Sequence, residues 1–175
     1  KLLNAGQTCV APDYVLAAAG IKNRLAAALR AEFARFPGQG GAALGNSEYA
    51  RIVSSEVMAR LQKLSDGAAV CDYTSLRMAP LVMDEVGPEH PVMNEEIFGP
   101  LLPILGVADL NAAAEFVRAR EKPLACYIFT GSRATAEDLL GRIPCGGACV
   151  NDTIMHLVSP YLPFGGVGAS GMGRY

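Results

Sequence analysis

Short apolar runs of strand length alternate with amphipathic segments of helical length along most of this 175-residue chain. β-branched and aromatic residues are frequent in the strand-like runs, and apolar residues recur every three or four positions in the helix-like segments. Parallel strands need crossover helices to join them. The alternation therefore predicts an α/β fold, with a largely parallel open sheet and flanking helices. Such sheets bind ligands beyond the carboxyl ends of their strands.

The expected elements follow one another without an internal repeat or a visible domain boundary. Strands are expected at residues 14–19, 78–86, 101–107, 124–130 and 147–151, and helices at 21–36, 47–64, 109–120 and 135–143. Ser47, Asp109 and Thr135 are the expected N-caps of the last three helices, because a short polar side chain there accepts a hydrogen bond from the helix. Ile52 and Val53 are expected on a buried helix face. Residues 38–46 are glycine-rich but lack the spacing of a dinucleotide-binding loop, so we expect a plain loop.

Composition excludes several classes of function. The net charge of −2 arises from mixed charges without runs, which predicts no nucleic-acid partner and no basic membrane-binding face. No apolar stretch is long enough to span a membrane. No two cysteines have Cys-x-x-Cys spacing, and only two histidines are present, so no metal site is expected. We expect the cysteines to be reduced thiols of a cytoplasmic protein. They are Cys9, Cys71, Cys126, Cys145 and Cys149.

Cys9 is the candidate nucleophile of the chain. It follows Gly6 and Thr8, where a turn is expected to lead into a short helical segment. A helix N-terminus favours the thiolate by lowering the pKa of a cysteine, and its N–H groups can stabilise an oxyanion on an attacked carbonyl. The alternative, a cysteine that only packs as a small apolar side chain, stays open at this point.

Two further stretches are candidates for ligand binding. Glu95 and Glu96 precede Phe98 and a Gly-Pro corner, and a carboxylate there could accept the two hydroxyl protons of a ribose or could simply be solvated. The stretch from Leu162 to Tyr175 holds five glycines in fourteen residues and is expected to be a shaped loop. Its glycines could bring the backbone close to a ligand or could merely permit tight turns.

Three segments in this order closely resemble the catalytic domain of the aldehyde dehydrogenase superfamily. They are Asn-Ala-Gly-Gln-Thr-Cys at 4–9, Glu-Glu-Ile-Phe-Gly-Pro at 95–100 and Pro-Phe-Gly-Gly-Val-Gly-Ala-Ser-Gly-Met-Gly at 163–173. The stretches Cys-Val-Ala-Pro-Asp-Tyr at 9–14 and Val-Asn-Asp-Thr-Ile-Met-His at 150–156 resemble the class-three, fatty-aldehyde and coniferyl-aldehyde dehydrogenase branch. The resemblance covers essentially the whole chain.

The resemblance implies a role for each candidate residue. Cys9 matches the nucleophile that adds to the aldehyde, and Glu96 matches the residue that holds the nicotinamide ribose of NAD or NADP. Phe98 matches an aromatic neighbour of the nicotinamide, and Phe164 matches an aromatic residue that lines the substrate tunnel. The implied reaction oxidises an aromatic (coniferyl-type) or long-chain aldehyde to the acid through a thiohemiacetal and a thioester. Asn151, Asp152 and His156 match a branch signature, for which we expect a structural role.

The resemblance also implies that parts of the enzyme lie outside this chain. In the family the general-base glutamate, an oxyanion-hole asparagine and the Rossmann-type cofactor domain precede the nucleophile, and an oligomerisation strand follows the glycine-rich stretch. We therefore expect residues 1–175 to be the catalytic domain of a longer protein that is a homodimer. Two other hypotheses stay open: a non-catalytic interaction or assembly domain, and an acylating relative that passes the thioester to coenzyme A or phosphate.

Overall fold

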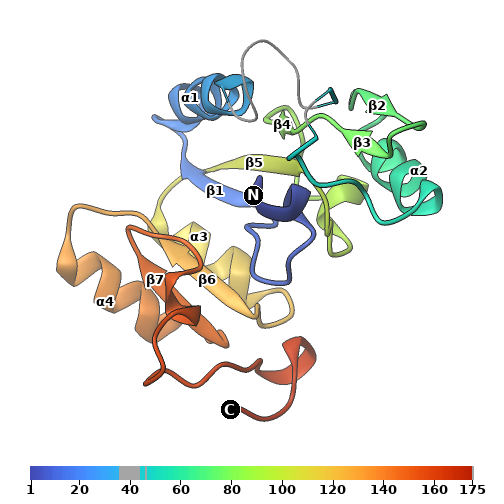
Figure 1. Cartoon of the computed structure of the whole chain (residues 1–175). Helices are drawn as coiled ribbons and strands as arrows, with labels where there is room; N and C mark the ends of the chain where they lie inside the picture. Colours follow the sequence, from blue (N-terminus) through green and yellow to red (C-terminus); the bar gives the residue numbers. More distant parts are fainter. Residues whose placement is uncertain (36–43, 46, 175) are drawn as a thin grey trace. The chain divides into compact units, whose positions relative to one another are not determined.

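The computed structural model describes residues 1–35, 44–45 and 47–174, and these divide into two compact units (Figure 1). The first unit is Lys1–Gly106 and the second is Val107–Tyr175. The boundary between them is not visible in the sequence pattern, because it falls between the last two residues of the strand at 101–107, without a linker of distinctive composition. Most of the expected glycine-rich loop at 38–46 lies outside the described residues.

A three-stranded sheet forms the centre of the first unit. Its strands have the order β1 (Val15–Ala18), β5 (Leu101–Val107) and β4 (Leu81–Met83), and β4 and β5 run parallel with Leu81 opposite Leu101. The expected strand at 101–107 is confirmed at both ends, and the expected strand at 14–19 is one residue shorter at each end. A parallel sheet of this kind confirms the predicted fold class.

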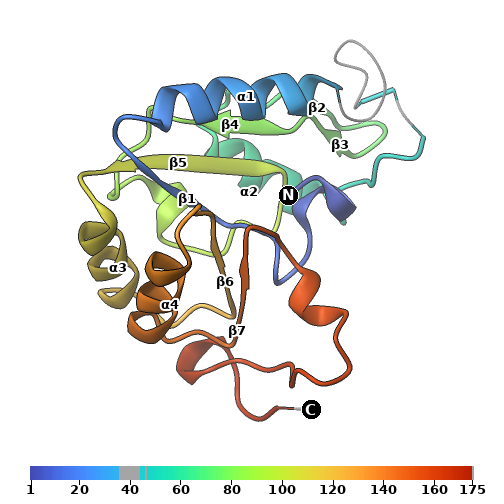
Figure 2. The same ribbon diagram turned by 90° about the vertical axis from the view of Figure 1, so that its left-hand side faces the viewer.

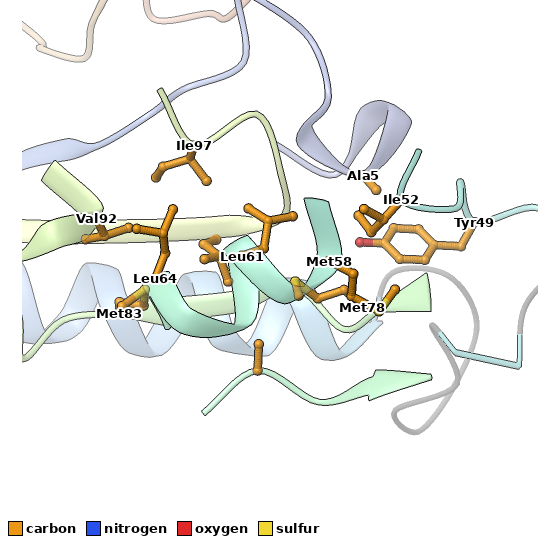
Figure 3. Close-up of a cluster of buried hydrophobic side chains, with 12 residues drawn as sticks. Ala5, Tyr49, Ile52, Met58, Leu61, Leu64, Met78, Met83, Val92 and Ile97 are labelled. Carbon is orange, nitrogen blue, oxygen red and sulfur yellow. The ribbon is translucent and has the colours of Figure 1, made fainter. Parts of the chain in front are cut away.

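Helices cover both faces of this sheet. Alternate residues of a strand point to opposite sides, so each face presents apolar side chains that a helix can bury. Helix α1 (Lys22–Arg35) lies along one face (Figure 2), where Ala26 packs with Val82 and Ile104. Helix α2 (Ser55–Leu64) contributes Met58, Leu61 and Leu64 to a buried cluster (Figure 3). The same cluster includes Leu101 of β5. The expected helix at 21–36 is therefore confirmed within the described residues.

Helix α2 begins seven residues later than expected. Ser54, not Ser47, is the N-cap, and its hydroxyl accepts a hydrogen bond from the N–H of Val57 at 3.3 Å. Ile52 is buried before the helix starts, whereas Val53 is 74% exposed, so its expected place on a buried face is wrong. The residues before Ser54 are held by tertiary hydrogen bonds, including Ile52 N–H to Leu76 O at 2.7 Å, which compete with helix formation.

The expected single strand at 78–86 is two short strands. A hairpin pairs β2 (Cys71–Asp72) with β3 (Arg77–Met78) antiparallel, and β4 begins only after Pro80. Proline has no N–H to donate to a strand pairing, so it separates β3 from β4. The hairpin itself has no sequence signal of the usual two-residue type.

The second unit places two helices on a parallel pair of strands. Its elements are α3 (Leu110–Arg118), β6 (Ala125–Ile128), α4 (Arg133–Arg142), β7 (Gly147–Val150) and the short 3₁₀ helices η3 (Met155–Leu157) and η4 (Gly168–Ser170). Ala114, Ile128 and Leu139 form the centre of its apolar cluster. Asp109 caps α3 as expected, but Ser132, not Thr135, caps α4, where its hydroxyl accepts from the N–H of Thr135 at 3.3 Å.

No helix within the described residues is both long enough and apolar enough to cross a membrane.

Candidate functional site

Cys9 lies at the tip of an exposed turn in the first unit. The N–H of Ala11 donates to the carbonyl of Thr8 at 2.9 Å and closes the turn, while Val10 is buried and anchors it. The thiol is exposed and makes no disulfide. The expected helix start at Cys9 is wrong, because the only helical segment of this loop is the 3₁₀ helix η1 (Leu3–Gly6), which ends before it.

The loop that leads to Cys9 has an unusual backbone. Asn4, Ala5 and Gly6 all have positive φ, at 50°, 52° and 74°. The Gln7 side chain ties this loop to residues 51–53. Its amide nitrogen donates to the carbonyl of Arg51 at 2.9 Å, and its amide oxygen accepts from the N–H of Val53 at 3.0 Å. Non-glycine residues in the left-handed region are costly and persist where the surrounding structure holds them, and they are found often at functional sites.

The loop and the Glu-Glu-Ile-Phe-Gly-Pro segment lie against each other, although about ninety residues separate them in the sequence. A Cβ placed on Gly6 would lie 2.1 Å from the carbonyl oxygen of Gly99, so the two backbones are in direct contact. The Asp13 carboxylate accepts a hydrogen bond from the N–H of Ile97 at 3.1 Å. Ala5 and Ile97, one from each segment, belong to the same buried cluster (Figure 3).

Arg60 of helix α2 forms hydrogen bonds with the segment that contains Glu96. Its guanidinium donates to the carbonyl of Ile97 at 2.6 Å, to the carbonyl of Glu96 at 3.3 Å and to the Glu95 carboxylate at 2.8 Å. A planar guanidinium with several donors in fixed directions is suited to such a clamp. Glu95 is therefore engaged with Arg60, while the Glu96 side chain is exposed.

Phe98 adopts a backbone conformation that aromatic residues rarely take. Its φ is 45°, and its side chain remains 38% exposed between the buried Ile97 and Gly99. An exposed carboxylate at Glu96 and an exposed ring at Phe98 thus stand two residues apart on a segment whose backbone is held by Arg60 and Asp13. A carboxylate that can accept two hydroxyl protons beside an apolar ring fits a ribose linked to an aromatic base.

Asp13 also forms an ion pair with the buried side chain of Lys1. Lys1 Nζ is 3.9 Å from the Asp13 carboxylate, and the Lys1 side chain is almost entirely buried. Burial lowers the pKa of Lys1 to about 8, against the opposing attraction of Asp13 and Glu96. Burial also raises the pKa of Asp13, although Lys1 and the N–H of Ile97 oppose the shift.

Phe164 and the branch signature belong to the second unit. Phe164 is half-buried in the glycine-rich stretch, which contains η4 and otherwise has no regular structure, as expected. Asn151 exchanges two hydrogen bonds of 2.9 Å with the backbone of Thr130, in keeping with a structural role. His156 contacts the Cys149 thiol at 3.4 Å, and burial lowers the pKa of its imidazole.

Cys9, Glu96 and Phe98 therefore lie in one unit, on two segments that are in contact, and Phe164 lies in the other unit. Sequence reasoning missed Gln7 and Arg60, which shape the two segments through tertiary contacts. Neither has a sequence signal, because an amide in a loop and an arginine within a helix are both ordinary surface residues.

The sequence and the fold of the chain match those of known proteins. The model of the aldehyde dehydrogenase family matches residues 1–175. The chain is 41% identical to rat "Aldehyde dehydrogenase, dimeric NADP-preferring" and 44% identical to human "Aldehyde dehydrogenase family 3 member B1", in each case over the whole chain. A solved structure of Staphylococcus aureus AldH in a substrate-bound state matches with a TM-score of 0.93 and 41% identity. The chain spans 39%, 38% and 39% of the length of these three proteins.

Proposed function

Since the chain belongs to the aldehyde dehydrogenase family over residues 1–175, we propose that it carries the nucleophile and the nicotinamide-ribose contacts of an NAD(P)-dependent enzyme that oxidises aldehydes to carboxylic acids. One observation carries the proposal. The exposed thiol of Cys9 and the exposed side chains of Glu96 and Phe98 stand on two segments that are packed against each other through Gly6 and Gly99.

In the proposed reaction the Cys9 thiolate adds to the aldehyde carbon and forms a thiohemiacetal. This step matters because an aldehyde carries no readily lost hydride until a nucleophile has added to its carbonyl. The backbone N–H of Cys9 donates to the developing oxyanion, where a fixed donor lowers the barrier. The thioester left on Cys9 after oxidation is hydrolysed by water to the acid and the free thiol.

Glu96 and Phe98 would hold the cofactor. The bound nicotinamide would supply the acceptor for the hydride that the aldehyde loses. Glu96 accepts hydrogen bonds from the ribose hydroxyls, and Phe98 offers an apolar surface to the ring beside it. Arg60 would be a positioning residue, because its hydrogen bonds to the carbonyls of Glu96 and Ile97 hold the backbone of this segment.

The proposed substrate is an aromatic, coniferyl-type or long-chain aldehyde, with Phe164 in the substrate tunnel. A relative of 41% identity in Staphylococcus aureus is named "4,4'-diaponeurosporen-aldehyde dehydrogenase", and that name gives an aldehyde as the substrate of that protein. We also propose a homodimer, since the rat relative is named as dimeric, and a cytoplasmic location, since all five cysteines are free thiols. Residues 1–175 would then be the catalytic domain of that enzyme.

The test uses the full-length protein that contains these residues. Cys9→Ser should lower NAD(P)H formation from hexanal and coniferyl aldehyde by roughly a thousandfold or more, because loss of a nucleophile removes the covalent route. Cys71→Ser is the matched control, a half-buried cysteine of the same unit, and should leave the rate unchanged. Substantial turnover by Cys9→Ser would overturn the proposal, and acyl-coenzyme A or acyl phosphate as the product would identify an acylating enzyme instead.

Glu96→Gln tests the cofactor contact separately. An amide accepts hydrogen bonds from two hydroxyl groups less well than a carboxylate does. The rate of single-turnover NAD(P)H formation should therefore fall, by about a hundredfold if the nicotinamide ring moves by about 1 Å. An unchanged rate would remove Glu96 from the site.

A further inference from the structure

A cysteine and a histidine lie together on one face of the strand pair in the second unit. Gly147 and Cys149 of β7 share this face, since alternate residues of a strand point to the same side, and Tyr127 of β6 is the pairing partner of Cys149. The His156 ring lies over the face. A Cβ placed on Gly147 would lie 2.6 Å from Cδ2 of His156, and the ring centre of Tyr127 is 6.0 Å from that of His156. The absence of a side chain at Gly147 therefore provides the space in which His156 reaches Cys149.

The backbone after β7 presents His156 to the thiol in two ways. In the turn between β7 and η3, Asn151 and Ile154 have positive φ, at 55° and 57°. The N–H of His156 donates to the Cys149 sulfur at 3.2 Å, and Nδ1 of the His156 ring lies 3.4 Å from the same sulfur. Two nitrogen atoms of one residue thus contact the thiol of Cys149, which is a half-buried free cysteine.

The His156 imidazole is suited to accept the proton of this thiol. Burial lowers the pKa of the ring from its usual 6.5, so the ring is neutral at pH 7. Its Nε2 atom is buried and has no hydrogen-bond partner within the described residues, so a charged ring would hold a buried donor unpaired. With its proton on Nε2, the neutral ring offers the lone pair of Nδ1 to the thiol. This is the arrangement of a nucleophile beside a general base.

We propose that Cys149 and His156 form a second reactive thiol site, at which an α,β-unsaturated aldehyde alkylates Cys149 while His156 acts as the base. A thiolate is a strong nucleophile towards the conjugated carbon of such an aldehyde. Met155 and Leu157, which flank His156, are 48% and 43% exposed, and these apolar side chains favour an uncharged reagent over a charged one. The reaction uses neither Cys9 nor a cofactor, so it does not depend on the proposed dehydrogenase activity.

The proposed step is an addition without a change of oxidation state. Nδ1 of His156 takes the thiol proton as the Cys149 sulfur forms a bond to the β-carbon of the aldehyde. The electron pair of the carbon–carbon double bond moves to give an enolate, and the proton then passes from His156 to the α-carbon. One carbon–sulfur bond and one carbon–hydrogen bond form, one S–H bond and one π bond are lost, and the aldehyde group remains.

The experiment incubates the full-length protein that contains these residues with trans-2-hexenal at pH 7 without cofactor. Borohydride reduction then fixes the adducts, and mass spectrometry follows the adduct on each cysteine peptide over time. Cys149 should react at least about tenfold faster than Cys71, a half-buried thiol whose pKa is raised by burial. His156→Asn should slow alkylation of Cys149 by roughly a hundredfold, because a positioned base contributes about that much or more. The rate at Cys71 should be the same in both proteins.

The pH profile distinguishes a base from a side chain that only packs. The titratable side chains that contact the His156 ring are those of Cys149 and Tyr127. Between about pH 6 and pH 8 the wild-type rate at Cys149 should level off once the imidazole is neutral. In His156→Asn the rate should keep rising with pH, because only solvent then removes the thiol proton.

An absent adduct on Cys149, or a rate no faster than that at Cys71, would overturn the proposal. Equal rates at Cys149 in the wild type and in His156→Asn would also overturn it, because the thiol would then need no base. Thermal unfolding curves identify a variant that has lost its fold, and His156→Gln serves as a second variant in that case. The wild-type ratio of the two cysteine rates decides the proposal even if neither variant folds.

The outcome is separate from that of the dehydrogenase test, because Cys9→Ser should leave the rate at Cys149 unchanged.

Discussion

Gly6 and Gly99 meet backbone to backbone, with space for no side chain on Gly6. A Cβ on Gly6 would lie 2.1 Å from the Gly99 carbonyl oxygen, and a Cβ on Gly99 would lie 2.5 Å from a methyl carbon of Leu61. The cysteine loop, the Glu96 segment and helix α2 are therefore stacked through two glycines. This contact sets the position of Cys9 relative to Glu96 and Phe98, although all three are exposed.

Replacing Gly6 with alanine should destabilise the protein and displace the cysteine loop. The new methyl group meets Gly99, and the φ of 74° is unfavourable for alanine, so we expect a loss of about 1–3 kcal/mol in the free energy of unfolding. Gly20→Ala is the matched control, since a Cβ there has no neighbour within 4 Å. Urea unfolding of both variants measures the difference, and equal midpoints would refute the contact.

Replacing Arg60 with methionine should impair cofactor use more than stability alone explains. Methionine keeps the apolar stem but loses the hydrogen bonds to the carbonyls of Glu96 and Ile97, each worth about 1.5–3 kcal/mol when the donor is charged. We expect the KM for the nicotinamide cofactor to rise more than the KM for the aldehyde. Arg133→Met removes an exposed ion pair on α4 and should change neither value. An equal rise in both constants would indicate a purely structural arginine.

Replacing Phe164 with alanine should discriminate between aldehydes. A buried aromatic contact is worth about 2 kcal/mol, so kcat/KM for hexanal or coniferyl aldehyde should fall roughly thirtyfold relative to that for acetaldehyde. Phe129→Ala is the control, because Phe129 is 66% exposed in the same unit. If acetaldehyde and the larger aldehydes lose rate equally, Phe164 does not line the tunnel.

Alkylation of Cys145 should depend on pH differently from that of Cys71. Only the thiolate reacts, so with a pKa of about 7 the rate at Cys145 should be near half its maximum at pH 7 and level off above pH 8. Burial raises the pKa of Cys71 above its usual 9.0, so its rate should still be rising at pH 9. Peptide-resolved iodoacetamide labelling measures both. The neighbouring Cys126 is the main cause of the low pKa of Cys145, so Cys126→Ala should move the Cys145 midpoint upward, and an unmoved midpoint would show that Cys126 does not lower this pKa.

Much of the fold could be predicted from local pattern. The strand at 101–107 and the capping of α3 by Asp109 follow from an unbroken apolar run and from a polar residue before a periodic one. The start of α2 could not be predicted, because Ser47 and Ser54 are both acceptable caps. The choice between them is made by the hydrogen bonds of Gln7 and Leu76 to residues 51–53.

The candidate site also has some features that the sequence predicts and others that tertiary contacts determine. Sequence by itself determined the candidate site residues, a cysteine, a glutamate and two phenylalanines, because their motifs are contiguous and ordered along the chain. Tertiary structure decided how Cys9 is presented: at an exposed turn, without the helix expected there, on a loop held by Gln7 and pressed against Gly99. The physical reason is the different range of the interactions along the sequence. A cap or a strand depends on neighbours a few residues away, whereas the close contact of two glycines depends on packing between segments that the chain brings together only when it folds.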